Sequence, residues 1–89
     1  MHRADAVIVN KLGLHARPSA KITQLATRFA SEVWMTKGTR RINAKSIMGV
    51  MMLAAARGVT LSVEATGPDE VEAVAALCEL IAQGFGEEI

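Results

Sequence analysis

Short segments with alternating or β-branched apolar residues predict four strands in this chain. The clearest one ends at Thr66, and every second residue from Val59 to Ala65 is apolar and would face a core. A turn signal at residues 37–39 separates two further segments that would pair as a hairpin. The four predicted strands are residues 6–9, 32–36, 40–43 and 59–66.

Apolar residues at helical spacing predict a first and a last amphipathic helix. The first runs from about Ala16 to Arg28, and the last ends near Gln83, before Gly84. Acidic residues around position 70 favour the start of the last helix, and residues 86–89 are predicted to form a loose tail. The two apolar stripes contain Ile22, Leu25, Ala26 and Phe29 in the first helix, and Val71, Val74, Ala75, Cys78 and Ile81 in the last.

A short segment from Ile47 to Met52 predicts a third helix, which is apolar on nearly all sides. Ser46 is suited to cap its N-terminus. A short surface helix in so small a domain cannot hide every side, so part of its Met-rich face, with Met48 and Met51, is expected to be exposed. The alternative is that all of these residues belong to the core.

The element order is therefore β-α-β-β-α-β-α, in a single domain covering residues 1–89. One layer of strands has to be covered on one face by amphipathic helices, which predicts a two-layer α+β fold. Apolar residues make up 51% of the chain, as in folded rather than disordered sequences. No apolar run reaches the ~18 residues that span a membrane, so no membrane insertion is expected.

The number and position of the cysteine and histidine residues, together with the first residues of the chain, indicate its cellular compartment and which cofactors it could bind. Cys78 is the only cysteine, so neither an internal disulfide nor a Cys-based metal site is expected. His2 falls in a start that is predicted to fray, so we expect no metal cage and no cofactor. The start also lacks the long apolar region of a signal peptide. These features predict a cytoplasmic protein.

Charge is distributed unevenly, although the net charge is only +1. Residues 1–57 hold all ten basic residues and two of the nine acids, a formal charge of +8, and residues 58–89 hold the other seven acids. These charges either form ordinary solvated faces or steer a partner. Nucleic acid is disfavoured because two Phe, one Trp and no Tyr offer no stacking platform. An acidic protein surface is the better prediction.

The candidate chemistry lies in the segment Asn10–Ser19, where a loop runs into the first helix. Pro18 suits a first helical turn, which places His15 at the helix start beside free backbone N–H groups. Such an end attracts anions, and its dipole disfavours a cationic imidazole, so His15 would be a neutral nucleophile. Arg17 adds a guanidinium suited to a phosphate. The alternative is that His15 is only a cap or a surface residue.

Two separate motifs resemble the HPr family of the bacterial phosphotransferase system. The segment Leu12-Gly13-Leu14-His15-Ala16-Arg17-Pro18 resembles the family's active-site segment. The segment from Asn43 to Leu53, with Ser46, resembles its regulatory serine segment. Chain length and element order also agree, so the resemblance covers nearly the whole chain. Ser19 stands where the family usually has Ala, and we expect it to be tolerated.

The resemblance implies an open-faced β-sandwich, a four-stranded antiparallel sheet with three helices on one face. It implies that His15 accepts a phosphoryl group from enzyme I, derived from phosphoenolpyruvate, and passes it to enzyme IIA. Arg17 and the helix-start amides at Ala16 and Arg17 would hold the phosphate, and a serine kinase/phosphorylase would act on Ser46. The protein would be a monomeric carrier rather than an enzyme. The expected partner-binding residues are Lys21, Ile47, Met48 and Met51.

A second interpretation is a regulatory interaction domain with the same fold, which would bind a transcription regulator or kinase and contribute little to sugar transport. Residues 10–13 and 64–68 resemble the nitrogen-related branch of the family, whereas the Ser46 segment resembles its sugar-system members. A third interpretation, a small nucleic-acid-binding domain, lacks the necessary aromatic residues.

Overall fold

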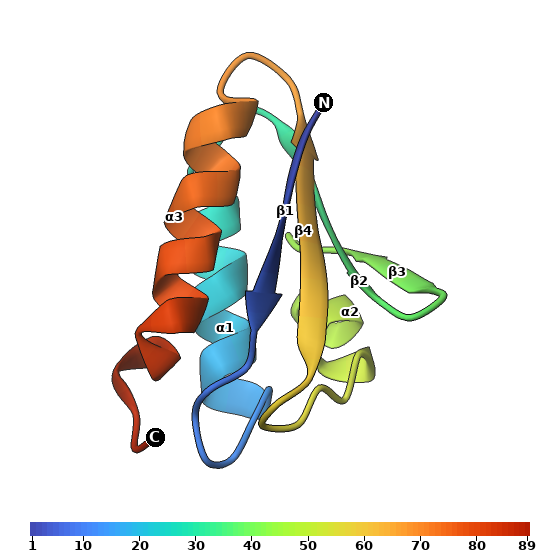
Figure 1. Cartoon of the computed structure of the whole chain (residues 1–89). Helices are drawn as coiled ribbons and strands as arrows, with labels where there is room; N and C mark the ends of the chain where they lie inside the picture. Colours follow the sequence, from blue (N-terminus) through green and yellow to red (C-terminus); the bar gives the residue numbers. More distant parts are fainter.

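Four strands and three α-helices follow one another in the predicted order in the computed structural model, which describes residues 1–89 (Figure 1). The chain ends in a short 3-10 helix, η1. The elements are β1 (His2–Val7), α1 (Ala16–Ala26), β2 (Glu32–Lys37), β3 (Arg40–Asn43), α2 (Ile47–Met52), β4 (Thr60–Thr66), α3 (Glu70–Ala82) and η1 (Gly84–Gly86). The predicted bounds of α2 and β3 are confirmed.

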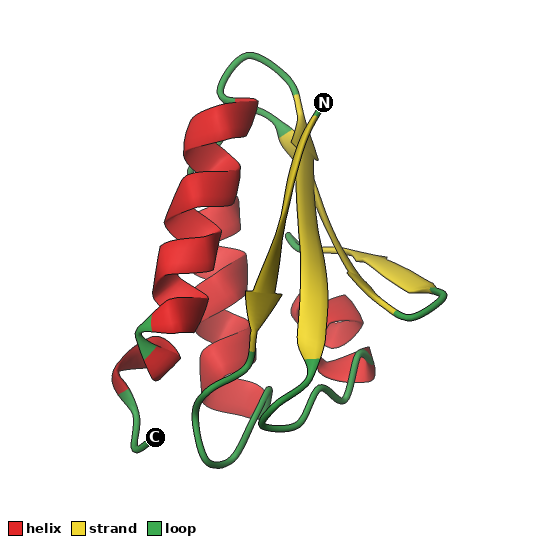
Figure 2. Cartoon of the chain, viewed as in Figure 1, coloured by secondary structure: helices red, strands yellow, loops and turns green.

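The strands form one antiparallel sheet in the order β1-β4-β2-β3. In the registers, Val63 of β4 lies between Ala4 of β1 and Met35 of β2. Helices α1 and α3 run side by side in opposite directions on one side of this sheet (Figures 1 and 2). The short α2 packs against α1 and β3. The predicted two-layer α+β architecture is therefore confirmed.

The core lies between the sheet and the helices and follows the predicted alternation. Leu61, Val63 and Ala65 of β4 are all fully buried, as expected for the inward positions of a half-covered strand. Burial of such side chains is the main favourable term in folding. Cys78 on α3 is only partly buried, and this burial raises the pKa of its thiol. The helices contribute mainly Ile22, Ala26, Ala73, Val74, Leu77 and Ile81 to the core.

The first strand begins four residues earlier than predicted and ends two residues earlier. It spans His2–Val7 rather than residues 6–9, and His2 pairs with Ala65 instead of belonging to a frayed start. The alternation of inward and outward residues in β1 is difficult to recognise in the sequence, because the inward residues are the small Ala4 and Ala6 rather than large apolar ones. Its outward Arg3 donates from Nε to Ser62 Oγ at 2.6 Å on the uncovered face of the sheet.

Both long helices end slightly before their predicted limits. Helix α1 ends at Ala26 rather than at Arg28, whose N–H donates to the carbonyl of Leu25, three residues back. Such i→i+3 bonds tighten the last turn of a helix and take it out of α geometry. Helix α3 ends at Ala82, one residue before the predicted Gln83.

A hydrogen-bonded latch joins the loop after α1 to the loop before α3. The Asp69 carboxylate accepts from the backbone N–H groups of Ala30 and Ser31, both at 2.9 Å, and from Ser31 Oγ at 2.5 Å. Asp69 makes no side-chain cap bond to its own helix. The latch needs glycine at position 67, because a Cβ there would lie 2.6 Å from Ser31 Oγ. We call this set the Ser31–Asp69 latch.

The latch predicts a loss of stability in acid. Its hydrogen bonds, from the Ser31 side chain first and the Ala30 amide second, lower the pKa of Asp69 below its usual 3.8. A carboxylate whose pKa is lower in the folded protein than in the unfolded chain stabilises the fold at pH values above the pKa of the unfolded chain. This stabilisation is lost as the pH falls through the pKa of the folded protein. Urea unfolding should therefore show the free energy of unfolding falling below about pH 4.

The variants Asp69→Asn and Glu72→Gln separate the latch from a general charge effect. Asp69→Asn should lower the free energy of unfolding at pH 7 and flatten its dependence on pH below 4. Glu72→Gln removes an equal charge from α3 at a residue outside the latch. The dependence of its free energy of unfolding on pH should stay as in the wild type. Parallel pH profiles for Asp69→Asn and wild type would contradict the assignment.

Candidate functional site

His15 is the N-cap residue of α1, but its side chain does not cap the helix. Its backbone is extended, with φ −83° and ψ −171°, and its carbonyl accepts the first helical bond from the N–H of Ser19 at 3.1 Å. The imidazole is 36% exposed and lies at the protein surface. The predicted place of His15 at the helix start is confirmed.

The first backbone amides of α1 have no partner within the protein. The N–H groups of Ala16 and Arg17 make no hydrogen bond, and Pro18 has no N–H. No acidic residue lies in the first turn. An open helix start of this kind is a site for an anion because the free donors and the helix dipole act together.

The loop before α1 is held in place by its contact with residues 55–56. The N–H of Leu14 donates to the carbonyl of Ala55 at 2.9 Å. Gly13 has φ +67°, and a Cβ at this position would lie 2.5 Å from the same carbonyl oxygen. Only glycine combines this backbone conformation with so close an approach. The segment that carries His15 is therefore fixed by main-chain contacts.

The chain end forms one wall of the site, so the prediction of a loose tail is wrong. Glu87 Oε1 lies 2.9 Å from His15 Nε2 and accepts from Asn10 Nδ2 at 3.1 Å. The N–H of Lys11 donates to the carbonyl of Glu88 at 2.9 Å. The periodicity used for helices and strands cannot detect such a wall, because it is built from contacts between distant segments.

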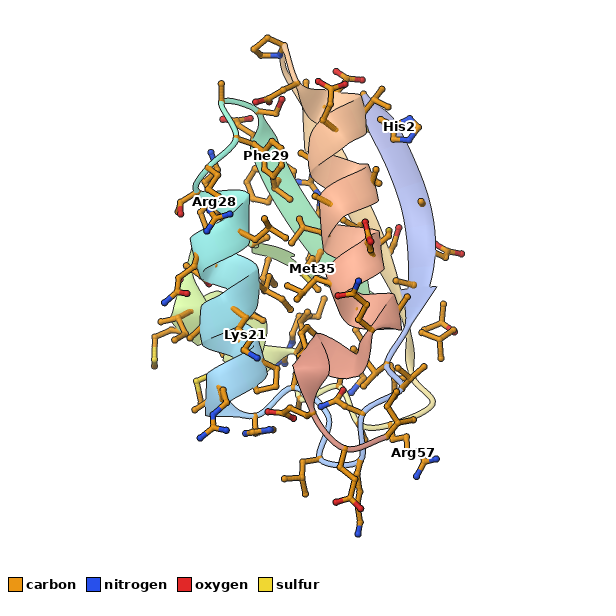
Figure 3. All side chains as sticks on the ribbon, turned by 90° about the vertical axis from the view of Figure 1, so that its left-hand side faces the viewer. His2, Lys21, Arg28, Phe29, Met35 and Arg57 are labelled. Carbon is orange, nitrogen blue, oxygen red and sulfur yellow. The ribbon has the colours of Figure 1, made fainter.

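A cavity of about 550 Å³ opens beside His15 and Glu87. Three basic residues, Lys11, Arg17 and Lys21, also line it, together with the acidic Glu88. Arg17 is exposed and makes no hydrogen bond within the protein. Lys21 instead donates from Nζ to the carbonyl of Phe85 at 2.6 Å, and Figure 3 shows it on α1 near the chain end. Part of its role is therefore structural.

Helix α2 carries the exposed apolar surface that its sequence predicts. Ile47, Met48 and Met51 are 40%, 68% and 41% exposed, while Val50 is fully buried. The alternative, that all residues of this segment lie in the core, is wrong. None of these three side chains lines the cavity, but α2 packs on α1, so the apolar surface adjoins the helix that carries His15. Apolar surface of this kind is typical of sites that contact a partner.

Ser46 caps α2, as predicted. Its Oγ accepts from the N–H of Gly49 at 3.2 Å, and the residue is exposed. Ser19, by contrast, is buried in α1, and its Oγ makes no hydrogen bond within the protein. Ser19 therefore contributes a small buried side chain to the helix, and it does not line the cavity.

The structure brings together His15, Arg17 and Lys21 and adds two residues that sequence reasoning missed, Asn10 and Glu87. The one available signal for Glu87 was Phe85, a large apolar residue between two glycines, directly before the predicted tail of residues 86–89. No group of three or more His, Cys, Asp or Glu residues is placed to hold a metal ion. None of the helices has the length and apolar content needed to cross a membrane.

Comparison with known proteins agrees with this arrangement. A family model described as "PTS HPr component phosphorylation site" matches residues 2–83. The phosphocarrier protein HPr of Cupriavidus necator is 60% identical over 98% of both chains. The phosphocarrier protein NPr of Escherichia coli is 45% identical over 91% of both chains. A crystal structure of HPr from Thermoanaerobacter tengcongensis is 46% identical over both complete chains and superposes with a TM-score of 0.95. The chain belongs to the HPr family of phosphocarrier proteins of the phosphotransferase system.

Proposed function

We propose that this protein accepts a phosphoryl group on His15 from phosphorylated enzyme I and passes it to an enzyme IIA. The observation that carries the proposal is the open start of α1. There an uncapped imidazole, 36% exposed, lies beside two backbone amides that have no partner. The protein acts as a carrier, and its donor and acceptor proteins supply the rest of each catalytic site.

Phosphoryl transfer depends mainly on positioning and on neutralising the charge of the transferred group. The amides of Ala16 and Arg17 and the guanidinium of Arg17 would serve this purpose, because each offers donors at the helix start. The site has few other fixed donors, which suits a group that has to be released again.

Both partner proteins would dock on one surface, which we call the docking patch: Lys21, Ile47, Met48 and Met51. Lys21 lines the cavity together with His15 and Arg17, and α2, which carries the apolar residues of the patch, packs against α1. Basic residues around it would steer an acidic partner, and the apolar side chains of α2 would lose water on contact. We propose that the protein works in the cytoplasm as a monomer.

A second candidate function is phosphotransfer in a nitrogen-related branch, with mainly regulatory contacts. The similarity to NPr supports it, although the identity to HPr of Cupriavidus necator is higher, at 60% against 45%. Purified enzyme I proteins of the sugar and nitrogen systems separate the two candidates. We expect faster phosphorylation by the sugar-system donor, and faster phosphorylation by the nitrogen-system donor would favour the alternative.

Incubation with enzyme I and phosphoenolpyruvate should produce an acid-labile phosphate on His15. His15→Ala should abolish labelling, and Arg17→Ala should slow it by about ten- to a hundredfold because a donor to the phosphoryl group is lost. Arg28→Ala is the control, since Arg28 lies just beyond the other end of α1 (Figure 3). Equal labelling of His15→Ala and wild type would contradict the proposed site.

Placing a carboxylate in the docking patch should weaken both partners. Met48→Asp introduces an acid where an apolar side chain has to lose water, so the Kd for enzyme I and for enzyme IIA should rise about tenfold or more. Val71→Asp makes the same kind of change at an exposed residue of α3 and should leave both values unchanged. Titration calorimetry measures both, and unchanged binding by Met48→Asp would remove α2 from the patch. Association should also slow as salt concentration rises.

We also propose that a serine kinase/phosphorylase uses Ser46 as a switch. A phosphate on Ser46 adds about −1.5 to −2 charge at the start of α2, next to Ile47 and Met48, so it should hinder docking and spare the fold. Ser46→Asp should therefore slow phosphorylation of His15 with little change in Tm. Ser46→Ala should keep the rate and lose only about 1 kcal/mol of stability from the lost cap. A wild-type rate or an unfolded domain for Ser46→Asp would leave Ser46 as a simple cap.

A further inference from the structure

Strand β1 forms one edge of the sheet, and half of its backbone groups have no partner. Its only neighbour in the sheet is β4. The N–H of Ile8 donates to the carbonyl of Val59 at 2.9 Å, so the even-numbered residues of the strand bond to β4. The N–H and C=O groups of the odd-numbered residues therefore point away from the sheet. These residues are Arg3, Asp5 and Val7.

An apolar groove of about 360 Å³ lies beside this free edge, where α3 packs against β1 (Figure 1). The residues that line it are Asp5, Ala6, Val7, Val9, Cys78 and Ala82. On α3, the spacing of Val71, Ala75, Cys78 and Ala82 places them along one side of the helix. Three of these four are exposed, and Cys78 is only partly buried. The four-stranded sheet thus leaves one apolar side of α3 uncovered next to β1.

A further strand fits both features of this surface. It would lie about 4.8 Å from β1, above the uncovered side of α3. Its backbone would pair with the free groups of β1, and every second side chain would point toward the groove. A bound helix would cover the apolar residues but leave the edge groups unpaired. The geometry is therefore specific for an extended segment.

The charges around the groove are acidic. Asp5 is exposed and makes neither a hydrogen bond nor an ion pair within the protein. Burial and, second to it, the charge of Asp5 raise the pKa of the Cys78 thiol, so this carboxylate acts on the groove itself. Glu72 and Glu79 are exposed on α3, three or four positions from Ala75. Basic side chains on the bound segment would complement these three acids.

The same charges disfavour a second copy of the chain on this edge. Two β1 strands that pair in antiparallel fashion through their free groups would be centred on Asp5. The two Asp5 carboxylates would then lie directly opposite each other, and like charges in that position are destabilising.

We propose that the free edge of β1 and the adjoining groove bind an extended segment of a partner protein in which apolar residues alternate with Lys or Arg. The groove shares no lining residue with the cavity beside His15, and β1 and α3 carry no residue of the docking patch. This second contact surface therefore goes beyond the proposed function and does not depend on it.

The test is an NMR titration of the full chain with a synthetic peptide of about seven residues in which Val and Lys alternate. The peptide should slow hydrogen exchange at the amides of Arg3, Asp5 and Val7, because a strand pairs with them. The even-numbered amides of β1 should exchange slowly with or without the peptide. A control peptide with Glu in place of Lys should bind about fivefold more weakly, because its charges repel the acids of the groove.

Two substitutions of Asp5 separate the charge from the backbone. Asp5→Lys should raise the Kd of the Val–Lys peptide about fivefold. Glu32→Lys is the matched control, since it makes the same charge change on β2, which β4 separates from β1, and it should leave the Kd unchanged. Asp5→Pro removes the central free N–H and no bond to β4, so it should fold and no longer bind the peptide. Amide spectra verify folding, and Asp5→Lys decides the question if the proline disrupts the strand.

Protection of the three edge amides, with weaker binding by Asp5→Lys and not by Glu32→Lys, supports the proposal. Peptide binding that leaves these amides unprotected, or an equal Kd for Asp5→Lys and Glu32→Lys, overturns it. Protection that appears with rising protein concentration and no peptide would show a second copy on the edge, and would also overturn it. Labelling of His15 by enzyme I tests the proposed function separately.

Discussion

Helix α1 begins without a side-chain cap, and the whole site depends on that omission. The missing N–H of Pro18 reduces the number of free donors, and the amides of Ala16 and Arg17 remain unbonded. Leaving out a cap costs about 1 kcal/mol. The contact between Leu14 and Ala55 holds the helix start instead, so the imidazole and the amides stay available for an anionic group.

The fold supplies the remaining parts of the site from distant segments. The antiparallel arrangement of α1 and α3 brings the end of α3 to the start of α1, and Figure 1 shows the C-terminus beside the loop that precedes α1. That closeness lets Glu87 reach His15 and lets Lys21 bind the carbonyl of Phe85. The acidic end of the chain thus meets its basic half at the site itself. Glu87 is the one acid whose side chain is bonded there, through its contact with the imidazole.

Local sequence patterns predicted those structural elements whose formation depends on residues close together in the chain. The alternation in β4 and the cap at Ser46 gave the correct elements because each depends on neighbouring residues. The small inward residues Ala4 and Ala6 concealed β1. The wall formed by Glu87 depends on contacts across more than seventy positions, for which no periodicity exists. The motif predicts His15 and Arg17, but it does not predict the burial of Asn10, because that burial follows from the chain end packed over it.

The central claim is that the open start of α1 receives the phosphoryl group. Amide NMR shifts of the phosphorylated protein, compared with those of the unmodified protein, test it most directly. Hydrogen bonds to the phosphoryl oxygens should give the largest downfield amide shifts at Ala16 and Arg17, with α3 nearly unchanged. Unshifted amides at Ala16 and Arg17 in a protein that carries phosphate on His15 would contradict the account.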